Sequence, residues 1–250
     1  MSDAISILER VEEVAEVLPP EARPDVSHII TEDDTPVDNL PSEKQQRLLT
    51  EPLYSSWEGP GEGRPFLAAA NVGLFAAVHQ PPVVPDVFLS LDVEVAEDWW
   101  AKEHRSYFFW EFGKPPEVVI EIVSNREGGE AGPKLRAYAR MGVVYYVIFD
   151  PLEQVQAGVL RAYALTPWRE YEETTPELLE GVGLGLTLWR GIFEAREDVW
   201  LRWQDEEGNL ILTGAERAEE ERRRAEQAEA RAARLVAQLR ALGVEPENDG

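Results

Sequence analysis

The chain has 250 residues, enough for one large domain with a sizeable core, and 44% of them are hydrophobic, which excludes a wholly disordered chain. A net charge of −24 disfavours binding to nucleic acid through bulk electrostatics. The absence of cysteine excludes disulfides and thiolate metal sites, and no apolar run reaches the about 18–20 residues that a membrane span needs. The N-terminus has no signal-peptide pattern, so we expect a cytoplasmic protein without membrane segments.

The first part of the chain, residues 1–41, is expected to form a short helix followed by an extended arm. Apolar residues recur at helical spacing over 5–18, and two prolines follow them. The stretch up to residue 41 is rich in Pro, Asp and Thr, which favours extended backbone. Ser42, with Gln45 three residues later, then predicts the capped start of a helix.

The middle of the chain predicts a strand, helix and strand in succession over 117–149. Alternating apolar side chains predict one strand earlier, over 87–95. The runs EVVIEIV and VVYYVIF are typical of buried strands, and a helix over 132–141 joins them, ended by Gly142. A crossover of this kind makes the two strands parallel.

The C-terminal part changes from short strands to one long charged helix. Short strands are predicted over 157–212, with a hairpin at the turn Asp205–Gly208. Thr213 and Glu216 match a capping box, so a helix begins there and runs to Gly243. Its seam favours a coiled coil between two copies, with a solvated helix as the alternative. The seam consists of Ala218, Ala225, Ala228, Ala232, Leu235, Leu239 and Leu242.

These elements predict an α/β protein in three parts. An N-terminal helix and arm cover 1–41, a folded domain covers 42–213, and a coiled-coil-like helix and tail cover 214–250. Residues 81–150 are the least acidic stretch before the tail and hold three of the four lysines. We therefore expect any approach to a phosphate to occur there.

Two acidic residues occupy positions that should be apolar. Glu121 interrupts the buried run VVIEIV, and Asp86 interrupts VVPDVFL. A buried carboxylate costs several kcal/mol unless it is paired, protonated or bound to a metal. Lys134 lies at the inward edge of the crossover helix, so the three side chains should converge. Two carboxylates can hold Mg²⁺ and a lysine can orient water, which together favour phosphodiester hydrolysis. A network that only fixes strand register is the alternative.

At these residues the sequence resembles a known family. VPDV, PPEVVIEIVSN and GPKLRAYARMGVVYYVIFDP resemble the Uma-two family of bacterial nucleases, within the PD-(D/E)XK superfamily. The similarity is close over 84–151 and weaker from Thr31 and on to Thr213. It implies a restriction-endonuclease-like mixed β-sheet flanked by helices. It also implies Asp86 and Glu121 as ligands of Mg²⁺ or Mn²⁺, and Lys134 as the catalytic lysine.

The sequence departs from the superfamily pattern in one place. Val123 stands where a strand lysine is usual, so the resemblance implies that the lysine has moved to the helix as Lys134. Glu130 is a minor candidate, because many members have an acid four residues before that lysine. The first helix often adds one further acid or glutamine, and three residues compete for that place: Glu43, Gln45 and Gln46.

Two functions follow from these observations. The first is a metal-dependent endonuclease that acts on DNA as a homodimer. A local basic patch would offset the overall acidity, formed by Lys102, Arg105, Lys114 and Arg126. The second is a catalytically inactive nuclease fold that works as an interaction protein through its coiled-coil tail.

Overall fold

The structure is a computed structural model that describes residues 18–19, 22–25, 39–124, 130–155 and 158–241. The chain divides into two compact units, residues 1–211 and 212–250. The helix expected over 5–18 and most of the arm lie outside the described residues. Within the described ranges, no helix is long and apolar enough to cross a membrane.

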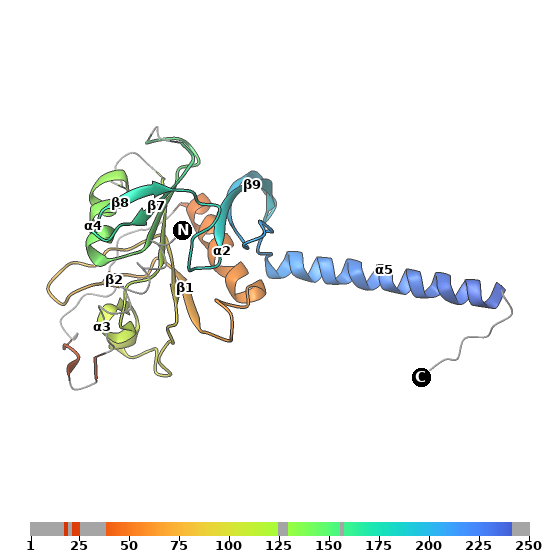
Figure 1. Ribbon diagram of the computed structural model, residues 1–250, viewed down its shortest axis with the longest axis horizontal. Coiled ribbons are helices and arrows are strands. Elements are labelled where there is room, and N and C mark those ends of the chain that lie inside the picture. The colour runs from red at the N-terminus through yellow and green to blue at the C-terminus, as the bar shows by residue number, and fades with distance from the viewer. Residues whose placement is uncertain (1–17, 20–21, 26–38, 125–129, 156–157, 242–250) are drawn as a thin grey trace. The chain divides into compact units, whose positions relative to one another are not determined.

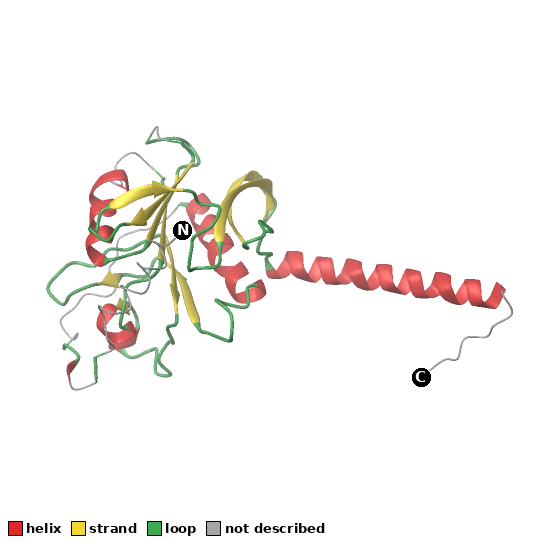
Figure 2. Cartoon of the chain, viewed as in Figure 1, coloured by secondary structure: helices red, strands yellow, loops and turns green. Residues whose placement is uncertain are grey.

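A six-stranded mixed sheet forms the centre of the first unit (Figures 1 and 2). Strands β5 and β6 are parallel, as predicted from the crossover, and every other neighbouring pair is antiparallel. In spatial order the strands are β1 (Phe66–Ala70), β3 (Val87–Leu91), β5 (Val118–Ile122), β6 (Tyr145–Phe149), β7 (Leu160–Leu165) and β8 (Tyr171–Thr174). The mixed sheet with flanking helices confirms the predicted fold class.

The two faces of the sheet are covered by different elements. One face packs with α2 (Leu40–Ser56) and with the hairpin of β9 (Gly185–Phe193) and β10 (Arg196–Gln204). The other face packs with α4 and the aromatic segment before β5. The remaining elements are β2 (Leu74–Phe75), η2 (Lys102–His104), β4 (Tyr107–Phe108), α3 (Phe109–Phe112), η3 (Glu130–Lys134), α4 (Leu135–Met141) and α5 (Gly214–Ala241).

The side chains of β5 alternate between these two faces, as they must in a strand. Val118, Ile120 and Ile122 join the cluster beneath α2 and β10. Val119 and Val123 join the cluster that holds Tyr138 of α4. Glu121 lies between Val119 and Val123 in this alternation, so its carboxylate belongs to the α4 side of the sheet.

The first described helix begins differently from the sequence expectation. The predicted Ser42 cap is wrong, because the Asn39 side chain accepts the hydrogen bond from Ser42 N over 3.0 Å and α2 starts at Leu40. Asn is at least as good an N-cap as Ser. Gln45 completes no capping box, since its amide side chain bonds to the backbone of Leu201 in β10.

Two strand predictions also need correction. The strand expected over 87–95 ends at Leu91, because Asp92 adopts a positive φ of 57° that ends the extended backbone. The predicted turn at Asp205–Gly208 exists, but only a single bridge between Gln204 and Leu210 follows it. Instead β10 pairs along its whole length with β9, and the second half of β10, which contains Trp200 and Trp203, is buried.

The second unit consists of α5 and its N-terminal cap. Thr213 N donates to Glu216 Oε2 over 2.8 Å, and Glu216 N donates to Thr213 Oγ1 over 3.1 Å, so the predicted capping box is confirmed. The helix has 28 residues, none of them buried, and several intrahelical ion pairs. Leu235 and Leu239 of the predicted seam are exposed.

Candidate active site

Asp86 and Glu121 lie at the same end of two adjacent strands. Strands β3 and β5 pair Val87 with Ile120, so one further step of this antiparallel register sets Asp86 opposite Glu121. Asn71 N donates to the Asp86 carbonyl over 3.2 Å and continues the ladder toward β1. Residues that face each other in register share one face of a sheet. The register therefore brings the two carboxylates together.

The Asp86 carboxylate takes the place of a backbone hydrogen-bond acceptor at the end of β3. Ile122 N donates to Asp86 Oδ2 over 2.6 Å. No residue of β3 lies opposite Ile122 to accept this bond through its carbonyl group, because β3 begins only at Val87 and Pro85 precedes Asp86. An N–H group at this depth needs an acceptor, and the side chain supplies it. This bond orients one carboxylate oxygen and leaves the half-buried Asp86 at the opening of the site.

Glu121 is enclosed and held by two side chains from the following helical segment. Its exposed fraction is 0%. Tyr138 Oη donates to Glu121 Oε1 over 2.6 Å, and Lys134 Nζ donates to Oε2 over 2.7 Å. The Lys134 side chain is 31% exposed, so its ammonium group lies between the buried carboxylate and solvent. Lys134 ends η3 and precedes α4, one turn before Tyr138.

Burial raises the pKa of the Glu121 carboxyl group to about 8. That value is a balance of opposing effects: the negative charge of Asp86 also raises the pKa, whereas the charge of Lys134 and the hydrogen bonds from Lys134 and Tyr138 lower it. Tyr138 responds in the same environment, since burial and the adjacent Glu121 raise its pKa. Among the described residues, the site thus places two carboxyl groups beside the ammonium group of Lys134.

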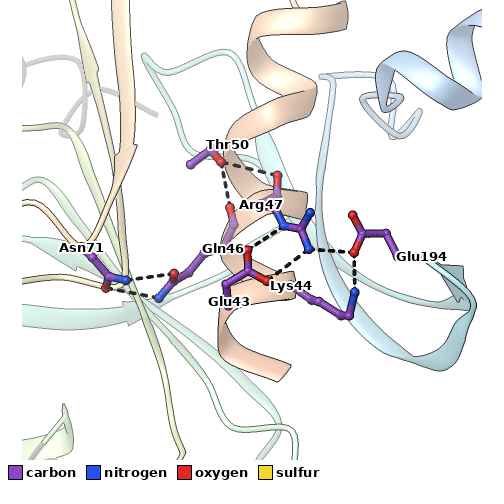
Figure 3. Close-up of polar contacts among 7 residues, drawn as sticks. All are labelled: Glu43, Lys44, Gln46, Arg47, Thr50, Asn71 and Glu194. Carbon is purple, nitrogen blue, oxygen red and sulfur yellow. Dashed lines mark hydrogen bonds and ion pairs between the residues drawn. The ribbon is translucent and has the colours of Figure 1, made fainter. Parts of the chain in front are cut away.

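The first helix contributes one glutamine to this group. Gln46 Nε2 lies 3.4 Å from Asp86 Oδ1, and Gln46 exchanges two hydrogen bonds with Asn71, at 3.1 and 3.3 Å (Figure 3). Gln45 forms hydrogen bonds instead with the backbone of Leu201 in β10. Glu43 forms an ion pair with Arg47 (Figure 3). Of the three first-helix candidates, the geometry thus selects Gln46.

Asn71 is the site neighbour that the sequence did not reveal. It follows β1 in a positive-φ conformation, with φ of 56°, and its amide group meets Gln46. Asn, like Asp, is enriched among the non-glycine residues that adopt that backbone region. Nothing in its local pattern marks it as a site residue, because its position depends on how β1 pairs with β3.

Other sequence candidates lie elsewhere. The side chain of Val123, which stands in place of the usual strand lysine, is buried. Glu130 is in η3, but its side chain and all of Arg126 lie outside the described residues. In the predicted basic patch, Lys114 forms an ion pair with the buried Glu117, and Arg105 donates to the Trp100 carbonyl over 2.7 Å.

An apolar cavity of about 430 Å³ opens on the same face of the sheet as the acids. Phe88, two residues after Asp86 in the strand, forms part of its wall, and the exposed Trp99 and Trp100 lie at its edge. The cavity lining does not include Asp86, Glu121 or Lys134. The cavity and the acidic pair therefore lie on one face of the sheet without sharing a lining residue.

The oxygen atoms at the site suit a hard divalent cation. Among the described residues, no group of three or more His, Asp or Glu side chains gathers as a complete protein cage for a metal. Mg²⁺ does not require such a cage, because one or two carboxylates with waters and substrate phosphate are its usual ligands. Asp86 and Glu121, with the Gln46 amide nearby, are a donor set of this kind. The residues present therefore fit Mg²⁺ or Mn²⁺.

Comparison with known proteins agrees with this geometry. The sequence profile of one family, described as "Putative restriction endonuclease", matches residues 19–188. The chain belongs to the Uma2 family. Members of Uma2 fall within the PD-(D/E)XK-like superfamily, and the mixed sheet with flanking helices is consistent with the restriction-endonuclease-like fold. The match spans α2, the whole six-stranded sheet and part of β9, so it includes Asp86, Glu121 and Lys134. No curated protein matches the chain.

Proposed function

We propose that this Uma2 protein is a divalent-metal-dependent endonuclease that hydrolyses phosphodiester bonds of DNA. The observation that carries the proposal is the fully buried Glu121 carboxylate, opposite Asp86 in the register and hydrogen-bonded to Lys134 over 2.7 Å. A purely structural role for Glu121 does not require Asp86 at a position where its charge raises the Glu121 pKa. Membership of a restriction-endonuclease family supports DNA as the substrate.

Each residue has a role that its contacts support. Asp86 and Glu121 would hold Mg²⁺ or Mn²⁺, and such an ion, when bound, polarises a phosphoryl oxygen. The Lys134 ammonium group, partly exposed beside Glu121, orients the attacking water or stabilises charge on the phosphate oxygens. Tyr138 holds the Glu121 carboxylate in one orientation, and Gln46 does the same for Asp86.

The net charge of −24 sets a condition on this activity. Long-range repulsion between an acidic protein and a polyanion slows their association and weakens nonspecific binding. A divalent cation between two carboxylates reduces this repulsion at the point of contact. We therefore infer weak binding to DNA without metal and tighter binding with it.

The test uses Asp86→Asn, because the amide oxygen can still accept the hydrogen bond from Ile122 N. Mn²⁺ should raise the melting temperature of the wild type and leave that of the variant unchanged. Supercoiled plasmid should be nicked by the wild type with Mg²⁺ or Mn²⁺ and not by the variant. Equal metal stabilisation of both proteins, with no nicking in any divalent metal, would overturn the proposal in favour of an inactive nuclease fold.

We further propose that α5 joins two copies of the chain as a coiled coil. No described residue of α5 is buried, although Leu235 and Leu239 lie on its predicted seam. A helix in a protein owes most of its stability to the packing of its apolar stripe against a partner. The α5 helix of a second copy would supply that partner. Such a dimer would carry two candidate sites.

A further inference from the structure

Arg161 of β7 is a buried arginine whose hydrogen-bonding capacity is not used. Its exposed fraction is 9%, and Nη1 donates only a long hydrogen bond, 3.3 Å, to Tyr163 Oη. Nε and Nη2 are both buried and have no hydrogen-bond partner among the described residues. A buried guanidinium group without acceptors is costly, so its retention calls for an explanation.

The position of Arg161 connects it to the candidate active site. Glu121 of β5 pairs with Ile148 of β6, and Ile148 pairs with Arg161 of β7. Residues paired in this way lie in one row and on one face of the sheet. Arg161 therefore shares the row of Asp86 and Glu121, two strand spacings or about 10 Å beyond Glu121.

The two unused nitrogens are the edge of the guanidinium group that binds an oxyanion with two parallel hydrogen bonds. The same chain uses this edge elsewhere. Arg64 Nε donates to Asp92 Oδ1 over 2.6 Å, and Arg64 Nη2 donates to Asp92 Oδ2. At Arg161 the corresponding edge lacks any carboxylate among the described residues, so an anion from outside the chain can take that place.

We propose that Arg161 binds a DNA phosphate through Nε and Nη2, at a position next to the phosphate that faces Asp86 and Glu121. This inference rests on the proposed function for its ligand. A separation of about two strand spacings excludes a shared contact with the phosphate at Lys134 and suits a neighbouring phosphate of the same strand. Because no described acceptor holds the Nε–Nη2 edge, a turn of the side chain toward that phosphate breaks only the bond to Tyr163.

The experiment compares Arg161 with Arg202, a second buried arginine whose guanidinium group contacts the protein's own backbone and an aromatic ring. Arg202 Nη2 donates to the Ile211 carbonyl over 2.9 Å, and its guanidinium group stacks on Trp189. Affinity for a short fluorescein-labelled duplex is measured by anisotropy with Ca²⁺ over a range of salt concentrations. Arg161→Met should reduce the slope of log K against log salt by about 0.9, the contribution of one phosphate contact. Arg202→Met should leave this slope unchanged.

Arg161→Lys keeps the positive charge but cannot form the bidentate pair of hydrogen bonds. This variant also keeps the inference testable if Arg161→Met fails to fold. It should keep the salt slope and bind DNA about tenfold more weakly, whereas Arg202→Lys should bind as the wild type does. Wild-type affinity in Arg161→Lys, an unchanged slope in Arg161→Met, or a wild type that binds no duplex would overturn the inference. Plasmid nicking is measured separately. An altered slope with no nicking by the wild type would support the phosphate contact while contradicting the endonuclease.

Discussion

Tyr138 and Glu121 are joined by a 2.6 Å hydrogen bond between a buried helix residue and a buried strand residue. The tyrosine ring also packs against Tyr146 of β6, with ring centroids 5.2 Å apart. The hydroxyl group is thereby held above a carboxylate that has no contact with bulk water. This one contact couples the packing of α4 on the sheet to the protonation state of the candidate site.

Tyr138→Phe should therefore destabilise the protein in a pH-dependent way. The hydrogen bond to a neutral carboxyl group is worth about 1 kcal/mol, and that to an ionised one about 1.5–3 kcal/mol. The loss in free energy of unfolding, measured with urea, should grow between pH 6 and pH 9. Tyr171→Phe is the matched control, since Tyr171 Oη donates to the neutral Val143 carbonyl. A loss that does not vary with pH would contradict this view.

Glu121 itself makes the metal-free protein less stable as the pH rises. Its folded-state pKa of about 8 lies above the ordinary glutamate pKa of 4.5, so the folded state binds more protons than the unfolded state between these two pH values. Its contribution to stability is largest below about pH 4.5 and decreases as the pH rises toward 8, by about 1.4 kcal/mol for each unit of pKa difference. Glu121→Gln should remove this contribution. Parallel stability–pH curves for wild type and variant would refute the assignment.

Lys134 is expected to affect catalysis, and a second lysine provides the control. Lys134→Met should reduce plasmid cleavage by about 100-fold or more, because it removes a cation from the reacting phosphate. Lys114→Met breaks a comparable partly buried pair with Glu117 and should reduce stability while cleavage stays within a few-fold of wild type. Equal losses of activity in the two variants, at equal folded fractions, would mean that Lys134 acts only on structure.

Substitutions of two adjacent glutamines in α2 should distinguish an effect on metal binding from an effect on stability. Gln46→Ala removes the amide near Asp86, so we expect weaker Mn²⁺ binding, seen as a smaller metal-induced rise in melting temperature. Gln45→Ala removes two hydrogen bonds to the Leu201 backbone and should cost about 2 kcal/mol of stability without changing that rise. The reverse pattern would assign the site glutamine to Gln45.

The role of α5 can be tested in the full chain. Leu235→Asp with Leu239→Asp places charges on the expected seam and should convert a dimer into a monomer, as measured by size exclusion with light scattering. A pair of substitutions on another side of the helix, Arg223→Asp with Arg234→Asp, tests whether charge alone is responsible. If all of these proteins have the mass of the wild type, α5 is not the dimer element.

Local patterns were sufficient to predict the elements whose signals lie within a few residues. The apolar run of β5, the stop at Gly142 (φ 89°) and the capping box at Thr213 depend on nearby side chains and backbone, and each is confirmed. The start of α2 was predicted wrongly because Asn39 and Ser42 both cap helices well, and the choice depends on where Gln45 packs. The pairing of β10 with β9 was missed for a similar reason, since a hairpin partner is chosen by burial of a whole strand face.

The candidate site divides in the same way. An acid in a run of branched apolar residues marks Glu121 and Asp86 as candidates from the sequence alone, because the cost of burying charge makes such residues rare without a partner. Only the tertiary structure decided that Gln46, rather than Glu43 or Gln45, approaches Asp86, that Asn71 joins it, and that Arg161 shares the row of Glu121. These relations depend on strand register and on the rotation of α2 over the sheet, which are determined by packing between residues far apart in the chain.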